Sequence, residues 1–361
     1  MTSPVPELKI LVVEDEDSKI SEWQDAIAAH NADEENKGFR IQMTTSKNVT
    51  DAKRQLDLHR LDAVVVDLRL QVEPGVADNN SQGNDLVRHI LEVQPLGVVV
   101  YTGQQADADT ASYDCPQVRV MDKADGMEQV FTWLGENKDV FLRLRGAKSA
   151  FNRETARVFF RSIWPRWSHW TSSTVQGADL TEVVARHVVA HVHDSMLNAG
   201  GDATHPEEAY FVPPLKARLD TGDLVQYDGG TWVVVTPRCD LANQGKVATI
   251  LLAFCEDISA KWKELEASGN ANKAEKEMKR LIQHEGMPKQ HFLHPMRDAA
   301  GQARGPWMVQ FHHLKAIAAE QAFDELTPLR FASLSPLFIP SLVERFGAYF
   351  SRIGTPDYSS D

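Results

Sequence analysis

The chain has 361 residues, 42% of them hydrophobic and 25% charged, and a formal net charge of −13 at pH 7. This length predicts two or three domains with hydrophobic cores. The acidic balance argues against non-specific nucleic-acid binding by the whole molecule, although binding by a local patch remains an alternative.

The longest apolar runs have the length of strands and the N-terminus lacks a basic-then-apolar signal, so we expect a cytoplasmic protein that does not enter a membrane. The three cysteines, without CxxC spacing, predict neither a disulfide framework nor a zinc site.

Four apolar runs near the N-terminus are typical of buried parallel strands, and polar residues follow each of them directly or nearly so. Ligands of an open α/β sheet bind at the carboxyl ends of its strands, so we expect these polar side chains to converge on one spot. Three carboxylates, a hydroxyl and an ammonium would meet there. The runs are Ile10–Val13, Ala63–Val66, Val98–Tyr101 and Val118–Asp122, and the polar residues are Glu14 with Asp15, Asp67, Thr102 and Lys123.

These residue types suit a phosphorylation site. Glu14, Asp15 and Asp67 offer the hard oxygen ligands that Mg²⁺ prefers, and a carboxylate such as Asp67 can be the nucleophile that becomes an aspartyl-phosphate. Lys123 would add a positive charge and Thr102 a hydroxyl donor for the phosphoryl oxygens. A single one of these residues could equally cap or turn a strand end, but their order, with helices between, favours the site.

Residues 8 to about 136 resemble a response-regulator receiver domain (CheY-like), so we place a receiver domain at residues 1–136. The resemblance implies a doubly wound α/β fold with five parallel strands in the order 2-1-3-4-5. It also implies that a histidine kinase or phosphotransfer protein phosphorylates Asp67, that Glu14, Asp15, Asp67 and the Arg69 carbonyl hold Mg²⁺, and that Thr102 and Lys123 contact the phosphoryl group. The matching motifs are Ile10–Glu16, Val65–Leu70, Tyr101–Gly103 and Asp122–Ala124.

The chain departs from the receiver pattern at three places. The stretch Gln71–Gln82 predicts a long loop beside the acidic pocket, either a lid or partner contact or, as we favour, a tolerated surface insertion. Val120 stands where the family commonly has an aromatic switch residue, and Ala124 replaces a proline that often follows the lysine. The phosphorylation chemistry survives these changes, whereas the usual switch is put in doubt.

Residues 137–205 predict a helical connector. After a last receiver helix at Gly126–Trp133, a second amphipathic helix from Lys138 to about Ile163 is interleaved with basic residues, and Pro165 is expected to end it. This helix could carry the phosphorylation state onward, with a homodimer as one route, or contact nucleic acid through its basic and aromatic residues. Ordinary helix behaviour favours a third alternative, in which it packs between two domains with its arginines solvated.

A further helix is expected over Ala178–Leu197. His187 and His191 share one of its faces. The HExxH pattern and a third ligand are missing, so packing or surface histidines are favoured over a zinc site.

Residues 206–361 predict an α+β effector domain with a small closed β-barrel and an inserted charged helix over residues 260–284. The element order weakly resembles the SH3-like barrel of MazF/PemK-type toxins, which implies a ribonuclease, although the arginine expected after the hairpin is not clearly present. The predicted strands are Leu224–Tyr227, Trp232–Thr236, Val247–Phe254, Gln290–Leu293 and Trp307–Phe311.

The loop after the second of these strands is the candidate effector site. Arg238 could clamp a phosphate and Asp240 could act as a base, next to Thr236 and Cys239. The alternative, which turn chemistry favours, is that Pro237 and Asp240 shape a turn around a buried Cys239.

The sequence therefore predicts a two-component response regulator whose C-terminal domain binds a protein or nucleic-acid partner. A toxin-like endoribonuclease controlled by the receiver is the first alternative. An atypical DNA-binding transcription regulator is the second, disfavoured because no helix-turn-helix signature is evident.

Overall fold

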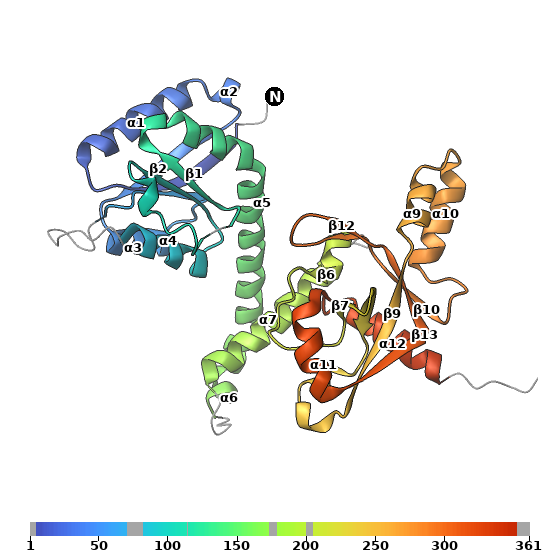
Figure 1. Ribbon diagram of the computed structural model, residues 1–361. Coiled ribbons are helices and arrows are strands. Elements are labelled where there is room, and N and C mark those ends of the chain that lie inside the picture. Colours follow the sequence, from blue (N-terminus) through green and yellow to red (C-terminus); the bar gives the residue numbers. More distant parts are fainter. Residues whose placement is uncertain (1–4, 71–81, 114, 173–178, 200–204, 352–361) are drawn as a thin grey trace, which may run out of the picture. The chain divides into compact units, whose positions relative to one another are not determined.

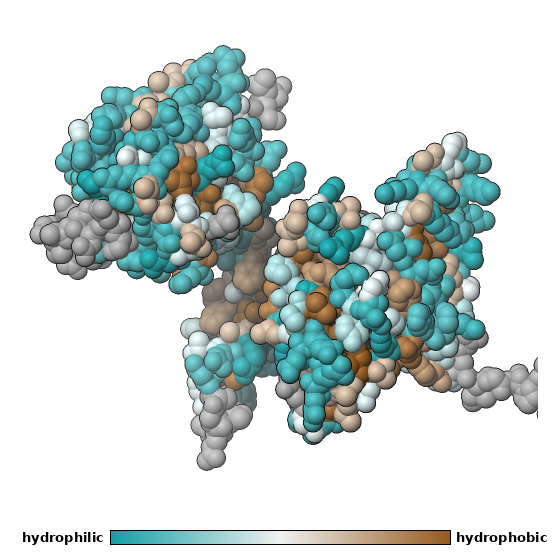
Figure 2. Space-filling model, viewed as in Figure 1, coloured by the Kyte–Doolittle hydropathy of each residue, from teal (hydrophilic) through white to brown (hydrophobic). Residues whose placement is uncertain are grey.

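The computed structural model describes residues 5–70, 82–113, 115–172, 179–199 and 205–351, which fall into two compact units, Met1–Gly200 and Gly201–Asp361 (Figure 1). Residues 71–81 of the predicted long loop and the tail from Thr355 lie outside these ranges. Most of the surface visible on each unit is hydrophilic, with scattered hydrophobic residues (Figure 2). Within the described residues, no helix is long and apolar enough to cross a membrane.

The first unit begins with a five-stranded sheet in the order β2-β1-β3-β4-β5, in which all neighbours are parallel. This confirms the strand order predicted from the sequence. The strands are β1 Glu7–Val13, β2 Arg40–Ser46, β3 Ala63–Val66, β4 Gly97–Thr102 and β5 Val118–Asp122, and the helices around them are α1 Asp17–Ala32, α2 Glu34–Lys37, α3 Val49–Leu58, α4 Gln82–Val93 and α5 Glu128–Val158, with short 3₁₀ turns at η1 Gln105–Asp107 and η2 Lys123–Asp125.

Helices cover both faces of this sheet, and this explains the uninterrupted apolar runs. Strands β3 and β4 are buried along their whole length, as expected for central parallel strands. On one face Trp23 of α1 and Leu134 of α5 pack into the core. On the other face Leu56 of α3 and Ile90 of α4 do so. With both faces filled, the loops at the carboxyl ends of the strands are left to form a site.

Helix α5 is one helix where the sequence predicted two. It has 31 residues and passes without interruption through the expected break between Trp133 and Lys138. Gly135 lies within it at a close contact, because a Cβ there would be 3.1 Å from a ring carbon of Phe39. Helical turns also continue beyond Pro165, because the proline stands in the first turn of a new segment, where its missing N–H costs no bond. The chain continues as a π-helical turn η3 (Phe159–Ile163), a 3₁₀ turn η4 (Trp164–Arg166) and α6 (Trp167–Ser172).

Helix α7 (Leu180–Ala199) closes the first unit and matches the helix predicted over Ala178–Leu197. It packs on the distal part of α5 through a small core of Val158, Ile163 and Val192. Figure 1 shows the distal half of α5 projecting beyond the sheet, so that the α5–α7 contact lies away from the strands.

The second unit is built on an antiparallel sheet of seven strands in the order β10-β13-β9-β8-β7-β14-β6. The strands are β6 Tyr210–Phe211, β7 Asp223–Tyr227, β8 Gly230–Val234, β9 Thr249–Asp257, β10 Gln290–Leu293, β13 Trp307–Ala318 and β14 Arg330–Leu334, with a separate ribbon of β11 Met296–Arg297 and β12 Ala303–Arg304. The helical elements are η5 Pro206–Ala209, α8 Arg238–Leu241, η6 Gln244–Lys246, α9 Ser259–Glu266, α10 Ala271–Ile282, α11 Ala319–Leu326, η7 Thr327–Leu329 and α12 Ile339–Phe350.

This sheet does not confirm the predicted five-stranded closed barrel. In the described residues β10 and β6 are its two edges, and the expected strand Trp307–Phe311 runs on to Ala318 with a register shift between Gln310 and Leu314. The inserted helix over 260–284 is also two helices, α9 and α10. The break occurs where Asn270 caps α10 by accepting a hydrogen bond from the Lys273 N–H.

Candidate phosphoacceptor site

The site lies at the carboxyl edge of the first sheet, where the parallel register brings the strand ends together. Glu14 directly follows β1, Asp67 follows β3, Thr102 ends β4 and Lys123 follows β5. Backbone bonds extend the ladder by one residue, since the Asp67 N–H donates to the Val13 carbonyl at 3.0 Å and the Glu14 N–H to the Ser46 carbonyl at 3.0 Å. The main chain that carries both carboxylates is therefore part of the sheet.

Lys123 bridges two of the carboxylates. Its Nζ lies 2.8 Å from Glu14 Oε2 and 2.8 Å from Asp67 Oδ2. The side chain of Glu14 is 3% exposed, that of Asp67 11% and that of Lys123 25%. The arrangement brings together three of the five predicted residues, and Lys123 has the most exposed side chain of the three.

Burial and charge act in opposite directions on these groups. Burial raises the pKa of Glu14 above its ordinary value, and the hydrogen bond and charge of Lys123 only partly oppose this. Burial alone would lower the pKa of Lys123, but its hydrogen bonds to Asp67 and Glu14 and their charges outweigh burial and raise that pKa. Lys123 therefore remains a fixed positive charge at neutral pH.

Thr102 is buried and belongs to a chain of hydrogen bonds that ties two loops together. Its hydroxyl oxygen accepts from the Gln104 N–H at 3.2 Å, and the Gln104 side-chain oxygen accepts from Arg69 Nε at 3.1 Å. Because the hydroxyl oxygen is the acceptor here, its proton can be donated to another group. The loop after β3 is thus held against the loop after β4.

Gly83 belongs to the site, although the sequence suggested only that it ends a loop. A Cβ at this position would lie 2.5 Å from Leu68 Cα and 2.6 Å from the Asp67 carbonyl oxygen. The Gly83 N–H donates to the Leu68 carbonyl at 3.2 Å. Only glycine permits this approach of α4 to the residues after Asp67.

A second missed residue is Tyr101. It is buried among the side chains beneath α1, with its ring edge-to-face against Trp23 at 5.3 Å, and its hydroxyl donates to the Lys123 carbonyl at 3.4 Å. Val120, at the expected switch position, is half-buried against the core on the opposite face of the sheet. The aromatic that contacts the lysine segment therefore comes from β4, directly before Thr102.

The donor set fits Mg²⁺ by its chemistry. Within the described residues, no three His, Cys, Asp or Glu side chains gather as metal ligands, because Lys123 lies between Glu14 and Asp67, while Asp15 is half-buried beside them. Mg²⁺ usually takes only one or two protein carboxylates and keeps several waters, so a preformed three-carboxylate cage is not required.

The predicted effector loop of the second unit is engaged in local contacts. The Thr236 hydroxyl is buried and accepts from the Leu251 N–H at 2.6 Å, and Arg238 Nε lies 3.1 Å from Asp220 Oδ2. Cys239 is exposed, contrary to the buried position expected in the turn alternative, with its Sγ 3.7 Å from Asp240 Oδ1. These contacts brace the connection between β8 and β9.

Comparisons with known proteins match the N-terminal third of the chain. A scan against family models gave no match, and a search of curated proteins gave none either. Among solved structures, the chain is similar to the response regulator TrrA from Thermotoga maritima in complex with Mg²⁺-BeF (15% identity, 36% of this chain and 97% of that one, TM-score 0.28). It is also similar to the receiver domain of a LuxO repressor protein from Vibrio parahaemolyticus (15%, 40% and 95%, TM-score 0.28). A third is a receiver domain protein from Clostridium thermocellum (21%, 37% and 98%, TM-score 0.27).

Proposed function

We propose that this chain is a two-component response regulator that accepts a phosphoryl group on Asp67 from a histidine kinase or phosphotransfer protein. The observation that supports this most directly is the Glu14–Lys123–Asp67 cluster at the carboxyl edge of a parallel sheet of order 2-1-3-4-5. A buried carboxylate beside a fixed ammonium is the arrangement that an aspartate nucleophile requires.

In the reaction, an Asp67 side-chain oxygen forms a bond to phosphorus. The bond from phosphorus to the donor's imidazole nitrogen breaks, and that nitrogen keeps the electron pair. Lys123, held 2.8 Å from Asp67, is placed to exchange its contact with the carboxylate for one with a phosphoryl oxygen. The Thr102 hydroxyl would donate to another such oxygen. Glu14, Asp15, Asp67 and the Arg69 carbonyl would hold Mg²⁺, which supplies charge compensation when bound.

For the second unit we propose a binding module for a downstream protein or nucleic acid, with residues 137–205 as connector and 206–361 as effector. The contacts of Thr236 and Arg238 within the turn favour a binding module over the toxin-like nuclease. The nuclease alternative would require purified protein to cleave RNA.

The phosphorylation proposal can be tested by incubating the full chain with acetyl phosphate and Mg²⁺ and measuring its intact mass. We expect the mass of one phosphoryl group to be added, and expect it to disappear in Asp67→Asn and after removal of divalent cations with EDTA. Asp125→Asn, an exposed aspartate in the turn after Lys123, is the matched control and should be labelled like the wild type. Labelling that persists in Asp67→Asn would show that another residue is the acceptor.

A further inference from the structure

The distal half of α5 and the turn after it form a strongly basic segment in an acidic protein. Residues 143–166 carry seven basic side chains and one acidic side chain, Glu154, whereas the whole chain has a net charge of −13. Arg153, Arg157 and Arg161 are exposed and follow one another at intervals of four residues, so they share one face. The seven basic residues are Arg143, Arg145, Lys148, Arg153, Arg157, Arg161 and Arg166.

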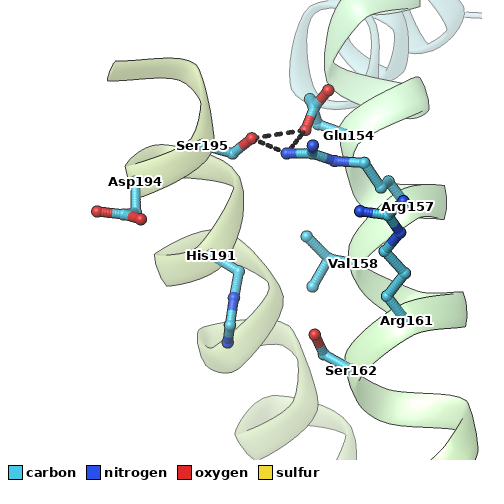
Figure 3. Close-up of a pocket in the computed structure, with 8 residues that line it drawn as sticks. All are labelled: Glu154, Arg157, Val158, Arg161, Ser162, His191, Asp194 and Ser195. Carbon is cyan, nitrogen blue, oxygen red and sulfur yellow. Dashed lines mark hydrogen bonds and ion pairs between the residues drawn. The ribbon is translucent and has the colours of Figure 1, made fainter. Parts of the chain in front are cut away.

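Part of this arginine row lines a groove of about 520 Å³ between α5 and α7. Figure 3 shows Arg157 and Arg161 side by side on the α5 side of the groove, while Asp194 on α7 points away from them. Arg157 is held in place, because its guanidinium contacts Glu154 at 2.7 Å and bonds to the Ser195 hydroxyl. Among the described residues, no hydrogen bond or ion pair engages Arg161. The rest of the lining consists of Val158, Ser162, His191 and Ser195 and the two acidic residues Glu154 and Asp194.

Two large aromatic side chains lie close to Arg161 in the sequence, one directly before it and one three residues after it. Phe160 is 66% exposed and Trp164 is 63% exposed. Both rings lean on Phe159, with centroids 5.5 and 5.8 Å away, so their faces are supported from within the protein. They lie on or directly after the π-helical turn η3, a type of irregularity that frequently marks functional sites.

We infer that this face binds single-stranded nucleic acid, with phosphates on Arg153, Arg157 and Arg161 and bases stacked on Phe160 and Trp164. A basic surface with neighbouring aromatic rings is the combination that sequence-tolerant single-strand binding uses. The positive charge here comes from the excess of basic residues over 143–166. A second copy of this chain is a poorer occupant, since it would bring the same arginine row against this one. The inference concerns the connector and stands whether or not Asp67 is phosphorylated.

The test uses full-length protein and fluorescein-labelled DNA and RNA single strands of one mixed sequence. A length of about 20 nucleotides exceeds the roughly 4–16 nucleotides that a single-strand binding site typically covers. Fluorescence anisotropy at several salt concentrations should show binding to at least one strand that weakens as salt rises. The two strands then tell whether the natural ligand is DNA or RNA.

The variant Arg153→Gln/Arg161→Gln should depend less on salt. The plot of the logarithm of the association constant against the logarithm of the salt concentration should become less steep, by about 0.7 for each phosphate that the variant no longer neutralises. Phe160→Ala/Trp164→Ala should weaken binding by about 5- to 140-fold per stacked base while leaving that slope unchanged. Arg54→Gln is the control for a single lost charge, since this arginine of α3 has a 68% exposed side chain and lies far from the arginine row in the sequence. It should bind like the wild type.

Absence of salt-dependent binding in the wild type overturns the proposal, as does an equal loss in the Arg54→Gln control. Sedimentation of the Phe160→Ala/Trp164→Ala variant tests whether this face instead joins two copies of the chain. If it is a monomer where the wild type is a dimer, and its nucleic-acid binding is unchanged, the face joins two copies of the chain and the inference is wrong. Circular dichroism checks that the variants remain folded, which is expected because all four substituted side chains are exposed.

Discussion

The two edges of the first sheet both hold a buried carboxylate paired with a basic residue, but the pairs differ in how completely they are enclosed. At the carboxyl edge, Lys123 is 25% exposed and shares itself between Glu14 and Asp67. At the opposite edge, Asp62 has a fully buried side chain that binds Arg145 Nη1 at 2.9 Å and the Lys9 N–H at 2.7 Å. Arg145 also donates to the Glu7 carbonyl at 3.0 Å.

This difference separates an exchangeable cluster from a permanent one. In the first, the partly exposed Lys123 contacts two carboxylates and can exchange one of these contacts, as phosphoryl transfer to Asp67 would require. The second fastens α5 to the start of β1 and β3, because Arg145 belongs to α5 and its partners belong to the sheet. The helix that leaves the first sheet is therefore anchored at the edge opposite the Glu14–Lys123–Asp67 cluster.

The largest expected effect comes from breaking the permanent pair. Arg145→Ala should lower the free energy of unfolding by about 3–5 kcal/mol, because it leaves the Asp62 charge buried without its partner. Urea denaturation measures this. The adjacent surface variant Arg143→Ala, on the same helix, should change stability by less than about 0.5 kcal/mol.

Replacing both Asp62 and Arg145 tests whether the stability lost in Arg145→Ala comes from the unpaired charge. Asp62→Leu/Arg145→Leu should recover much of the lost stability, because no unpaired charge is then buried. A double variant no more stable than Arg145→Ala would mean that the unpaired charge is not the main cause of the loss, and would point instead to the bonds to the Lys9 N–H and the Glu7 carbonyl.

The Asp62–Arg145 pair also shows what the sequence could not predict. Glu14, Asp67, Thr102 and Lys123 could be placed because each stands at the end of an apolar run, and parallel topology then brings the ends together. The partners Asp62 and Arg145 are 83 residues apart, and the arginine looked like one of several solvated charges on an amphipathic helix.

The other differences between the predicted and the observed elements also depend on tertiary contacts. Gly135 lies within the break expected between Trp133 and Lys138, yet the close approach of Phe39 makes use of this glycine within a continuous helix. In the second unit, local patterns predicted most of the longer strands, whereas the sheet order and the short edge strand β6 depend on pairings between distant residues.

The second prediction concerns the backbone at the exchangeable cluster. Gly83→Ala should destabilise the protein by about 1–3 kcal/mol, because the new methyl group would press on the backbone of Asp67 and Leu68. It should also slow labelling by acetyl phosphate, since the displaced backbone carries the acceptor. Gly146→Ala in α5 is the control, with open space around its Cβ, and should stabilise by about 0.5–1 kcal/mol. Normal labelling in a destabilised Gly83→Ala would show that α4 does not position Asp67.

The smallest expected effect is a change in pH dependence at the exchangeable cluster. Burial raises the pKa of Glu14, and Lys123 opposes that rise, so Lys123→Met should raise this pKa further. A carboxyl group whose pKa is higher in the folded than in the unfolded state contributes stability below its unfolded pKa, and this contribution is lost as pH rises through the folded pKa. The variant should therefore lose stability relative to the wild type between acidic and neutral pH, by about 1.4 kcal/mol for each further unit of pKa.

Urea denaturation across that pH range measures the loss of stability in Lys123→Met, and adding Glu14→Gln to Lys123→Met should remove most of it. A loss that persists in the double variant would show that Glu14 is not the group responsible for the pH dependence.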